Sequence, residues 1–187
     1  FYKGFSYISF DFIFGDYSPV GGGGIFPMIV TTIYTIIISL IIATPIGILA
    51  AVYLQEYAKQ GRLVRIIRYA TESLTGIPSI IYGLFGAVFF VAILKLGMSI
   101  IAASLTLTII VLPVIIRTTE EALKTVPASY REGSLALGTT KLQTLYKVIL
   151  PSAMPGILSG IILSIGRIVG ESAAIFLTAG TVAAMPE

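Results

Sequence analysis

Two oppositely charged residues, Arg167 and Glu171, stand four positions apart inside the last long apolar stretch of the chain. On one continuous helix this spacing places both side chains on the same face. The planar guanidinium of arginine offers parallel donors to an oxyanion such as phosphate. A neighbouring carboxylate could hold the guanidinium in place and lower its affinity for the anion. A charge inside a membrane is costly unless it is paired or faces water. The two residues therefore predict either the polar lining of an anion path or a mutually neutralised structural pair.

The composition indicates that most of the surface of this chain contacts lipid. Of its 187 residues, 56% are hydrophobic and 11% are charged, whereas soluble domains carry about 25% charged residues. The chain has no cysteine and no histidine, so it lacks thiolate ligands, disulfides and the most common general base. With a single carboxylate in its apolar stretches, it offers no catalytic constellation for a membrane enzyme.

Four apolar stretches have about the 20 residues that a helix needs to cross a bilayer. They cover residues 25–54, 74–94, 98–116 and 154–179. The segments richest in lysine and arginine, 55–73 and 117–147, fall in alternate connections, so both are expected on the cytoplasmic side. Residues 1–24 are then an extracytoplasmic lead-in. The basic residues spaced three apart in 55–73 are expected to contact anionic lipid head groups, and not nucleic acid.

Residues 129–149, within the second basic segment, predict two short helices. Two capping-box patterns occur, Ser129 with Glu132 and Thr140 with Gln143. Gly138 fits the left-handed residue that ends a helix. The expected helices cover 130–137 and 141–149, and their leucines give them an apolar face. The pattern alone leaves two interpretations open, an amphipathic hairpin lying on the membrane or a docking element for a soluble partner.

The same stretch resembles the EAA loop of ABC-importer permeases. That loop reads Glu-Ala-Ala, three residues, Gly, nine residues, then Ile-x-Leu-Pro. The matching residues here are Glu132, Gly133, Ser134, Gly138, Leu150 and Pro151, with Val148 in place of the isoleucine. The resemblance implies an all-α, MetI-like importer fold whose coupling helix sits in a cleft of a cytoplasmic ATPase subunit. The chain has no phosphate-binding loop of its own, so ATP and magnesium are expected on that partner, and no cofactor on this chain.

Further stretches resemble the phosphate permeases of the PstA type, over about residues 22–180. They are Gly76 to Ser79, Arg117 to Glu121, Pro151 to Gly156 and Gly166 to Ala174. The resemblance implies that Arg167 and Arg117 serve phosphate transport, although the place of Arg117 at the end of a span also suits a snorkelling anchor. It further implies a homologous permease subunit of the PstC type, two ATPase subunits, an extracytoplasmic phosphate-binding protein and a prokaryotic cytoplasmic membrane.

Two alternatives remain for the transported solute and the mode of transport. Sulfate or molybdate is possible, because an arginine does not by itself select an oxyanion. An oligomeric anion channel would use Arg167 as a selectivity ring, but it gives no reason for the spacing from Glu132 to Pro151. The family that the chain resembles normally has six spans. Since four are found here, one span is expected to be missing at each end.

Overall fold

The computed structural model describes residues 8–18 and 23–180, and within them every regular element is helical. Residues 1–7, 19–22 and 181–187 lie outside the description, and with them much of the predicted lead-in. The α-helices are α1 (Phe10–Phe14), α2 (Phe26–Val52), α3 (Arg62–Thr75), α4 (Ser79–Gly86), α5 (Ile100–Thr125), α6 (Ala128–Ala136), α7 (Lys141–Thr144), α8 (Leu150–Gly170) and α9 (Ala173–Ala179). The π-helical segments are η2 (Tyr53–Tyr57), η3 (Ala87–Ile93) and η4 (Leu145–Ile149). The predicted all-α fold is confirmed.

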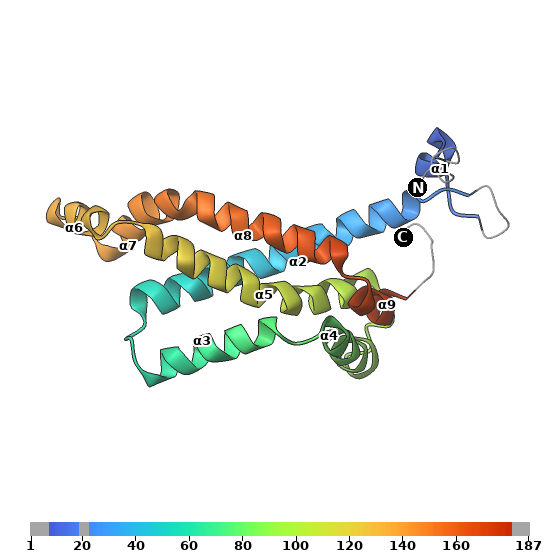
Figure 1. Ribbon diagram of the computed structural model, residues 1–187, viewed down its shortest axis with the longest axis horizontal. Coiled ribbons are helices and arrows are strands. Elements are labelled where there is room, and N and C mark those ends of the chain that lie inside the picture. The colour runs from blue at the N-terminus through green and yellow to red at the C-terminus, as the bar shows by residue number, and fades with distance from the viewer. Residues whose placement is uncertain (1–7, 19–22, 181–187) are drawn as a thin grey trace.

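Three long helices lie lengthwise and form the body of the molecule (Figure 1). They are α2 with η2, of 32 residues, α5, of 26 residues, and α7 with η4 and α8, of 30 residues. Each is long and apolar enough to cross a membrane. Helix α5 packs against α2 and α8 and also contacts α3, α4 and α9. It is therefore the element against which the others are positioned.

The predicted span 74–94 is not one straight helix. Helices α3 and α4 meet at a bend of 97°, centred on Pro78. Proline disfavours helical backbone at the preceding residue and has no N–H for a helical hydrogen bond. The hydroxyl of Tyr82 donates to the carbonyl oxygen of Leu74 at 2.7 Å, across the break. The bent pair counts as a fourth membrane crossing only if α3 and α4 together form one broken span.

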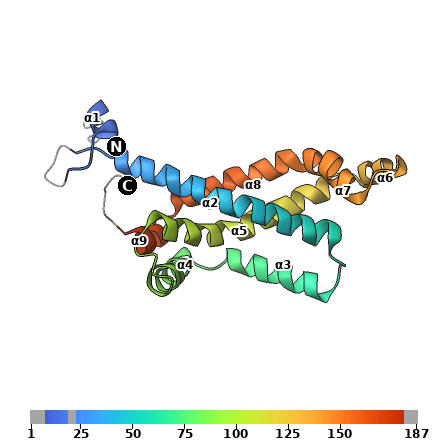
Figure 2. The same ribbon diagram turned by 180° about the vertical axis from the view of Figure 1, so that it is seen from behind.

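Helix α3, which lies in the basic segment 55–73, packs beside α5 (Figures 1 and 2). It starts near the end of the molecule that carries α6 and α7 and runs back along the bundle (Figure 2). Only Val64 of this helix is buried. The segment therefore does not form a free loop, and its basic side chains have a neighbouring helix to contact.

The predicted span 154–179 is also divided in two. Helix α8 ends at Gly170, the extended residue Glu171 follows with φ −88° and ψ 104°, and α9 begins two residues later. At its other end the helix is longer than expected, because α7, η4 and α8 continue one another from Lys141. Helix α9 packs against α4 and α5. The final predicted span is therefore a long helix followed by a short one on a different course.

Glycines allow the closest approaches between the long helices. A Cβ atom on Gly47 of α2 would lie 2.6 Å from Cγ2 of Ile115 on α5. A Cβ atom on Gly160 of α8 would lie 2.1 Å from Oγ1 of Thr118, also on α5. Small residues of this kind let helix backbones approach closely in membranes. The contact at Gly47 positions α2 on α5, and the contact at Gly160 positions α8, and with it Arg167, relative to α5.

Candidate coupling segment and solute-path residues

Residues 129–149, which we call the coupling segment, lie at one end of the molecule, where α6 and α7 extend beyond the bundle (Figure 1). The segment presents large apolar side chains to its surroundings, and Leu137 is 87% exposed. The others are Tyr130, Leu135, Leu142 and Tyr146. Exposed apolar side chains that gather on one projecting element are typical of an interaction surface.

One of the two predicted helix caps is present. The side chain of Thr140 accepts from the N–H of Gln143, and the Gln143 side chain accepts from the N–H of Thr140, so this capping box is confirmed. The predicted cap at Ser129 is wrong, because α6 begins two residues earlier than expected, after Pro127, and Ser129 makes no capping bond. Proline fits the start of a helix because its fixed φ is already helical.

Gly138 joins the two helices of the coupling segment in the left-handed conformation predicted for it. Its φ is +80°, and no atom lies within 4 Å of the place a Cβ would take. The glycine is therefore required by the backbone angle and not by lack of space, since side-chain-bearing residues avoid this region.

Three hydroxyl groups hold α6 to α7 inside the coupling segment. The Oγ of Ser134 lies 2.8 Å from Oγ1 of Thr139 and 3.0 Å from Oγ1 of Thr144, and the two threonine hydroxyls are 2.9 Å apart. Thr144 is buried. The serine that stands where the EAA pattern has its second alanine thus bonds across Gly138 to two hydroxyl groups that follow it in the chain.

The other predicted coupling residues stand in two groups. Glu132 and Gly133 are exposed on α6, and Glu132 takes part in none of the ion pairs of residues 8–18 and 23–180. Leu150 and Pro151 open α8 directly after η4. A π-helical segment such as η4 interrupts the usual helical hydrogen-bond pattern. Helix α8 nevertheless continues through Pro151 to Gly170. The end of the coupling segment is therefore continuous with the long helix α8.

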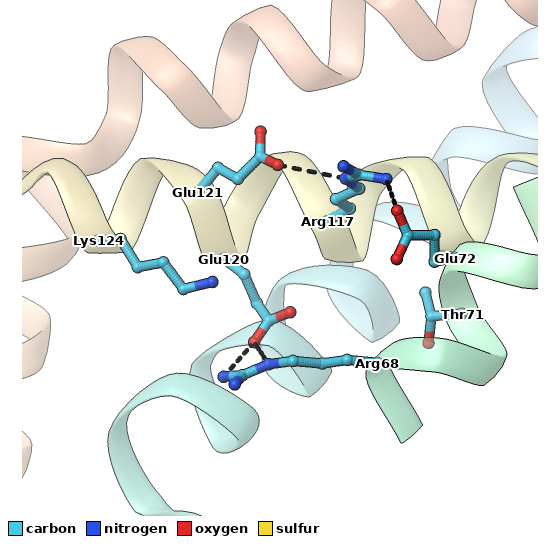
Figure 3. Close-up of a pocket in the computed structure, with 7 residues that line it drawn as sticks. All are labelled: Arg68, Thr71, Glu72, Arg117, Glu120, Glu121 and Lys124. Atoms are coloured by element: carbon cyan, nitrogen blue, oxygen red, sulfur yellow. Dashed lines mark hydrogen bonds and ion pairs between the residues drawn. The ribbon is translucent and has the colours of Figure 1, made fainter. Parts of the chain in front are cut away.

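Arg117 stands between two carboxylates in a cavity of about 190 Å³ between α3 and α5 (Figure 3). Its Nη1 donates to Glu72 at 3.0 Å, and its Nε donates to Glu121 at 3.2 Å. Deeper in the same cavity, Arg68 of α3 forms an ion pair with Glu120 of α5 at 2.9 Å. The Glu120 side chain is 8% exposed, whereas those of Glu72 and Glu121 are 59% and 60% exposed.

Sequence reasoning missed Arg68, Glu72 and Glu120 as parts of one site. The regular spacing of basic residues in α3 was visible, but it predicted contacts with lipid for all of them. Arg68 instead turns toward Glu120 of α5, which is 52 positions away in the sequence. With Lys124, the lining of the cavity has three cationic and three carboxylate side chains, so it is balanced in charge and its arginines are already paired.

Arg167 and Glu171 do not form the pair that their spacing predicts. Arg167 is half-buried in the last turn of α8, whereas Glu171 is the buried, extended residue that follows the helix. The Glu171 carboxylate accepts from the N–H of Ala174 at 3.3 Å, at the start of α9. Within the described residues neither side chain belongs to an ion pair. The prediction of a shared helix face is wrong because α8 ends between the two residues.

Arg167 and Arg117 lie at different levels of the bundle. Gly160 approaches Thr118, which is next to Arg117 in the chain. Residues 160 to 167 rise about 10 Å along an α-helix, so Arg167 lies nearer the end of the molecule that carries α9. In the part of the chain that the structure describes, no acidic cluster could hold a metal ion.

Three lengthwise apolar helices, with charged residues between them and a projecting hairpin that exposes apolar residues, define a polytopic membrane protein. The sequence pattern of the family described as "Binding-protein-dependent transport system inner membrane component" matches residues 43–186. The chain belongs to this family, whose members are transport permeases. The family resemblance inferred from the coupling segment is thereby confirmed.

Similar proteins come from several bacteria. The chain is 40% identical over 179 residues to the "Probable ABC transporter permease protein YqgI" of Bacillus subtilis (strain 168), which covers 95% of this chain and 61% of that protein. It is 40% identical over 158 residues to "Phosphate transport system permease protein PstA 1" of Mycobacterium tuberculosis (strain CDC 1551 / Oshkosh), covering 84% and 52%. For "Phosphate transport system permease protein PstA" of Pasteurella multocida (strain Pm70), the identity is 37% over 179 residues, covering 95% and 63%. The chain thus spans between about half and two thirds of the length of these relatives.

A solved structure of the MetNI methionine ABC transporter in an inward-facing conformation has the same fold. The TM-score is 0.68 at 27% identity, over 84% of this chain and 73% of that one. The MetI-like arrangement expected from the coupling segment is therefore confirmed.

Proposed function

We propose that this chain is part of the permease subunit of an ATP-driven importer that carries inorganic phosphate across the cytoplasmic membrane of a prokaryote. The observation that carries the proposal is the 37% to 40% identity to relatives named phosphate transport system permease proteins. The exposed coupling segment supports the ATP-driven mode, because an anion channel would have no use for it. In this proposal the chain itself carries out no covalent chemistry.

In this proposal the coupling segment lies in the cytoplasm, together with the basic segment 55–73. The residues that dock on the ATPase are Glu132, Gly133, Ser134, Gly138, Leu150 and Pro151. Two ATPase subunits bind ATP and magnesium and carry out hydrolysis, so this chain needs no cofactor. A homologous permease subunit completes the path, and a phosphate-binding protein delivers the solute at the end of the molecule opposite α6 and α7.

Arg167 is the residue proposed to bind phosphate along the path. Its guanidinium is half-buried and has no ion-pair partner among the described residues, so its donors are available to an oxyanion. The buried carboxylate of Glu171 at the end of the same helix adds negative charge that favours release. Arg117, held by Glu72 and Glu121, is proposed to meet the anion nearer the cytoplasm.

The test is uptake of radiolabelled phosphate into vesicles that contain the complete transporter, with binding protein outside and ATP inside. Arg167→Gln should abolish uptake while the subunits still assemble. Arg65→Gln is the matched control, because Arg65 is exposed on α3 and outside the proposed path, and it should leave uptake unchanged.

Each alternative gives its own result in the same vesicles. Uptake of sulfate or molybdate with no uptake of phosphate would replace the proposed solute by another oxyanion. Anion flux that persists without ATP would support a channel. Normal phosphate uptake by the Arg167→Gln variant would remove Arg167 from the path.

A further inference from the structure

Both helices of the coupling segment bind Glu56, at the end of the α2–η2 helix, and α7 also contacts Tyr57. From α6, Arg131 donates to Oε1 of Glu56, at 2.6 Å from Nη2 and 3.3 Å from Nε. From the first residue of α7, the Nζ of Lys141 donates to the main-chain carbonyl of Glu56 and lies 4.7 Å from the centre of the Tyr57 ring. Arg131 and Glu56 are 75 positions apart, so only the tertiary fold brings them together.

Arg131 also binds the end of α5. Its Nη1 donates to the carbonyl oxygen of Val126, and its Nη2 donates to that of Leu123, each at 3.0 Å. The side chains of Arg131 and Glu56 are 25% and 13% exposed, so this ion pair is shielded from solvent more than a surface pair. One guanidinium therefore connects α6, α5 and the end of α2. A lysine could not make all of these bonds, because it lacks the planar fork of donors.

The contact between the coupling segment and η2 is polar and not tightly filled. A cavity of about 130 Å³ lies beside it, lined by Glu56, Tyr57 and Arg131 together with Leu135 and Thr144 of the coupling segment. At this place directed hydrogen bonds hold the end of α2 to the coupling segment. They add to apolar packing, because Val52 of α2 belongs to the same buried cluster as Leu145 and Ile149 of the coupling segment.

The three long helices differ in how the chain connects them to the coupling segment. Helix α8 is continuous with α7, and α5 ends at Thr125, three residues before α6 begins. A displacement of the coupling segment therefore reaches α5 and α8 through the backbone. Helix α2 has no such connection. It packs on α5, and two hydrogen bonds join these helices at Ser39, which donates to the carbonyl oxygen of Ser104 and accepts from the hydroxyl of Thr108 through its own carbonyl. Ser39 is about 25 Å along the helix from Glu56, so these bonds do not hold the end of α2.

We propose that Glu56 and Arg131 form the link through which the coupling segment moves α2 when the ATPase closes. Without this link, α5 and α8 would follow the coupling segment through the backbone, whereas the end of α2 would follow only through its packing and would lag behind. The inference rests on the proposed function in one respect, that an ATPase acts on the coupling segment. It does not depend on which solute is carried. Glu56 and Arg131 are thus positioning residues that touch no solute.

The experiment measures the movement of α2 directly. Residues 1–187 contain no cysteine, so Tyr53→Cys on η2 and Leu163→Cys on α8 provide two labelling sites, and both side chains are 60% exposed. Spin labels at these sites, in the transporter assembled with cysteine-free partners, report the distance between α2 and α8 with and without ATP. Glu56→Gln removes the charge of the carboxylate, and Arg65→Gln is the control for loss of an exposed charge elsewhere.

The expected result is an ATP-dependent change in distance that Glu56→Gln shifts and Arg65→Gln leaves as it is, with the ATPase bound in both variants. An unchanged response in Glu56→Gln overturns the link, and so does the absence of any ATP-dependent response in the parent protein. If Glu56→Gln fails to assemble, Arg131→Lys takes its place, because a lysine keeps the charge but lacks the planar fork of donors, and an unshifted response again overturns the proposal. Failure of phosphate uptake in the parent, with the distance response intact, would reject the solute and leave the link standing.

Discussion

Arg167 and Glu171 are four residues apart, yet α8 ends between them and Glu171 binds the N–H of Ala174 instead. Their contributions to stability should therefore be independent. In a double-mutant cycle of Arg167→Gln and Glu171→Gln, we expect the two effects on the free energy of unfolding to add within about 0.5 kcal/mol. Thermal unfolding of the purified permease in detergent provides the measurement. Glu56→Gln with Arg131→Gln is the positive control, with a coupling of about 1–3 kcal/mol. A comparable coupling for Arg167 and Glu171 would show that they pair after all.

Replacement of Gly138 should strain the coupling segment. At φ +80° an alanine costs about 1–2 kcal/mol, although there is space for its Cβ. Gly133→Ala is the control for stability, because Gly133 is helical with nothing within 4 Å of its Cβ position, and we expect it to be neutral or slightly stabilising. Hydrogen exchange of α6 and α7 should rise in Gly138→Ala alone, and co-purification with the ATPase should weaken. Equal exchange in the two variants would refute the backbone argument.

Gly160→Ala should push α8 away from α5. Its Cβ would meet Oγ1 of Thr118 at 2.1 Å, and the β-branched threonine has little freedom to move. We expect a loss of about 1–3 kcal/mol from overpacking. Gly166→Ala on the same helix has nothing within 4 Å of the new Cβ and should not destabilise. Adding Thr118→Ala to Gly160→Ala should recover part of the loss in thermal unfolding, and no recovery would count against this close contact.

Ser134→Ala should weaken the connection between α6 and α7, even though it restores the residue of the EAA pattern. It removes the hydroxyl that contacts Thr139 and Thr144, at a cost of about 1 kcal/mol. Ser129→Ala is the matched control, because Ser129 makes no capping bond. The measurement is hydrogen exchange of the amides at the start of α7. If Ser129→Ala increased exchange as much as Ser134→Ala, the hydroxyl cluster would not be what holds the hairpin.

The two ion pairs between α3 and α5 should differ in their contribution to stability. Glu120→Gln removes the buried charge that pairs with Arg68, which keeps only its hydrogen bonds to Gln60 and Gln55, so we expect a loss of about 1–3 kcal/mol. Glu72→Gln removes an exposed partner of Arg117, and exposed ion pairs contribute about 0–1 kcal/mol. Thermal unfolding at low and high salt separates the two, because added salt should reduce the small effect of Glu72→Gln and leave that of Glu120→Gln. Equal losses would contradict the difference in burial.

Features that depend on neighbouring residues could be predicted from the sequence. The capping box at Thr140 and the left-handed glycine at position 138 follow from side chains and backbone angles within one turn. Long helices follow from uninterrupted apolar stretches, since a membrane helix satisfies its own backbone hydrogen bonds. The predicted cap at Ser129 was wrong for an equally local reason, because α6 begins two residues earlier than expected, directly after Pro127.

Contacts between distant segments were decided by the tertiary structure alone. The spacing of Arg167 and Glu171 assumes one helix, but α8 ends at Gly170 and α9 takes another course against α4 and α5. The bend between α3 and α4 lays α3 beside α5, and only then does Arg68 reach Glu120. Arg131 reaches Glu56 only because the end of the α2–η2 helix lies beside the coupling segment. Periodicity gives the face on which a side chain lies. The partner it meets depends on where helices end and how their small residues pack, and neither is encoded within a few positions of the chain.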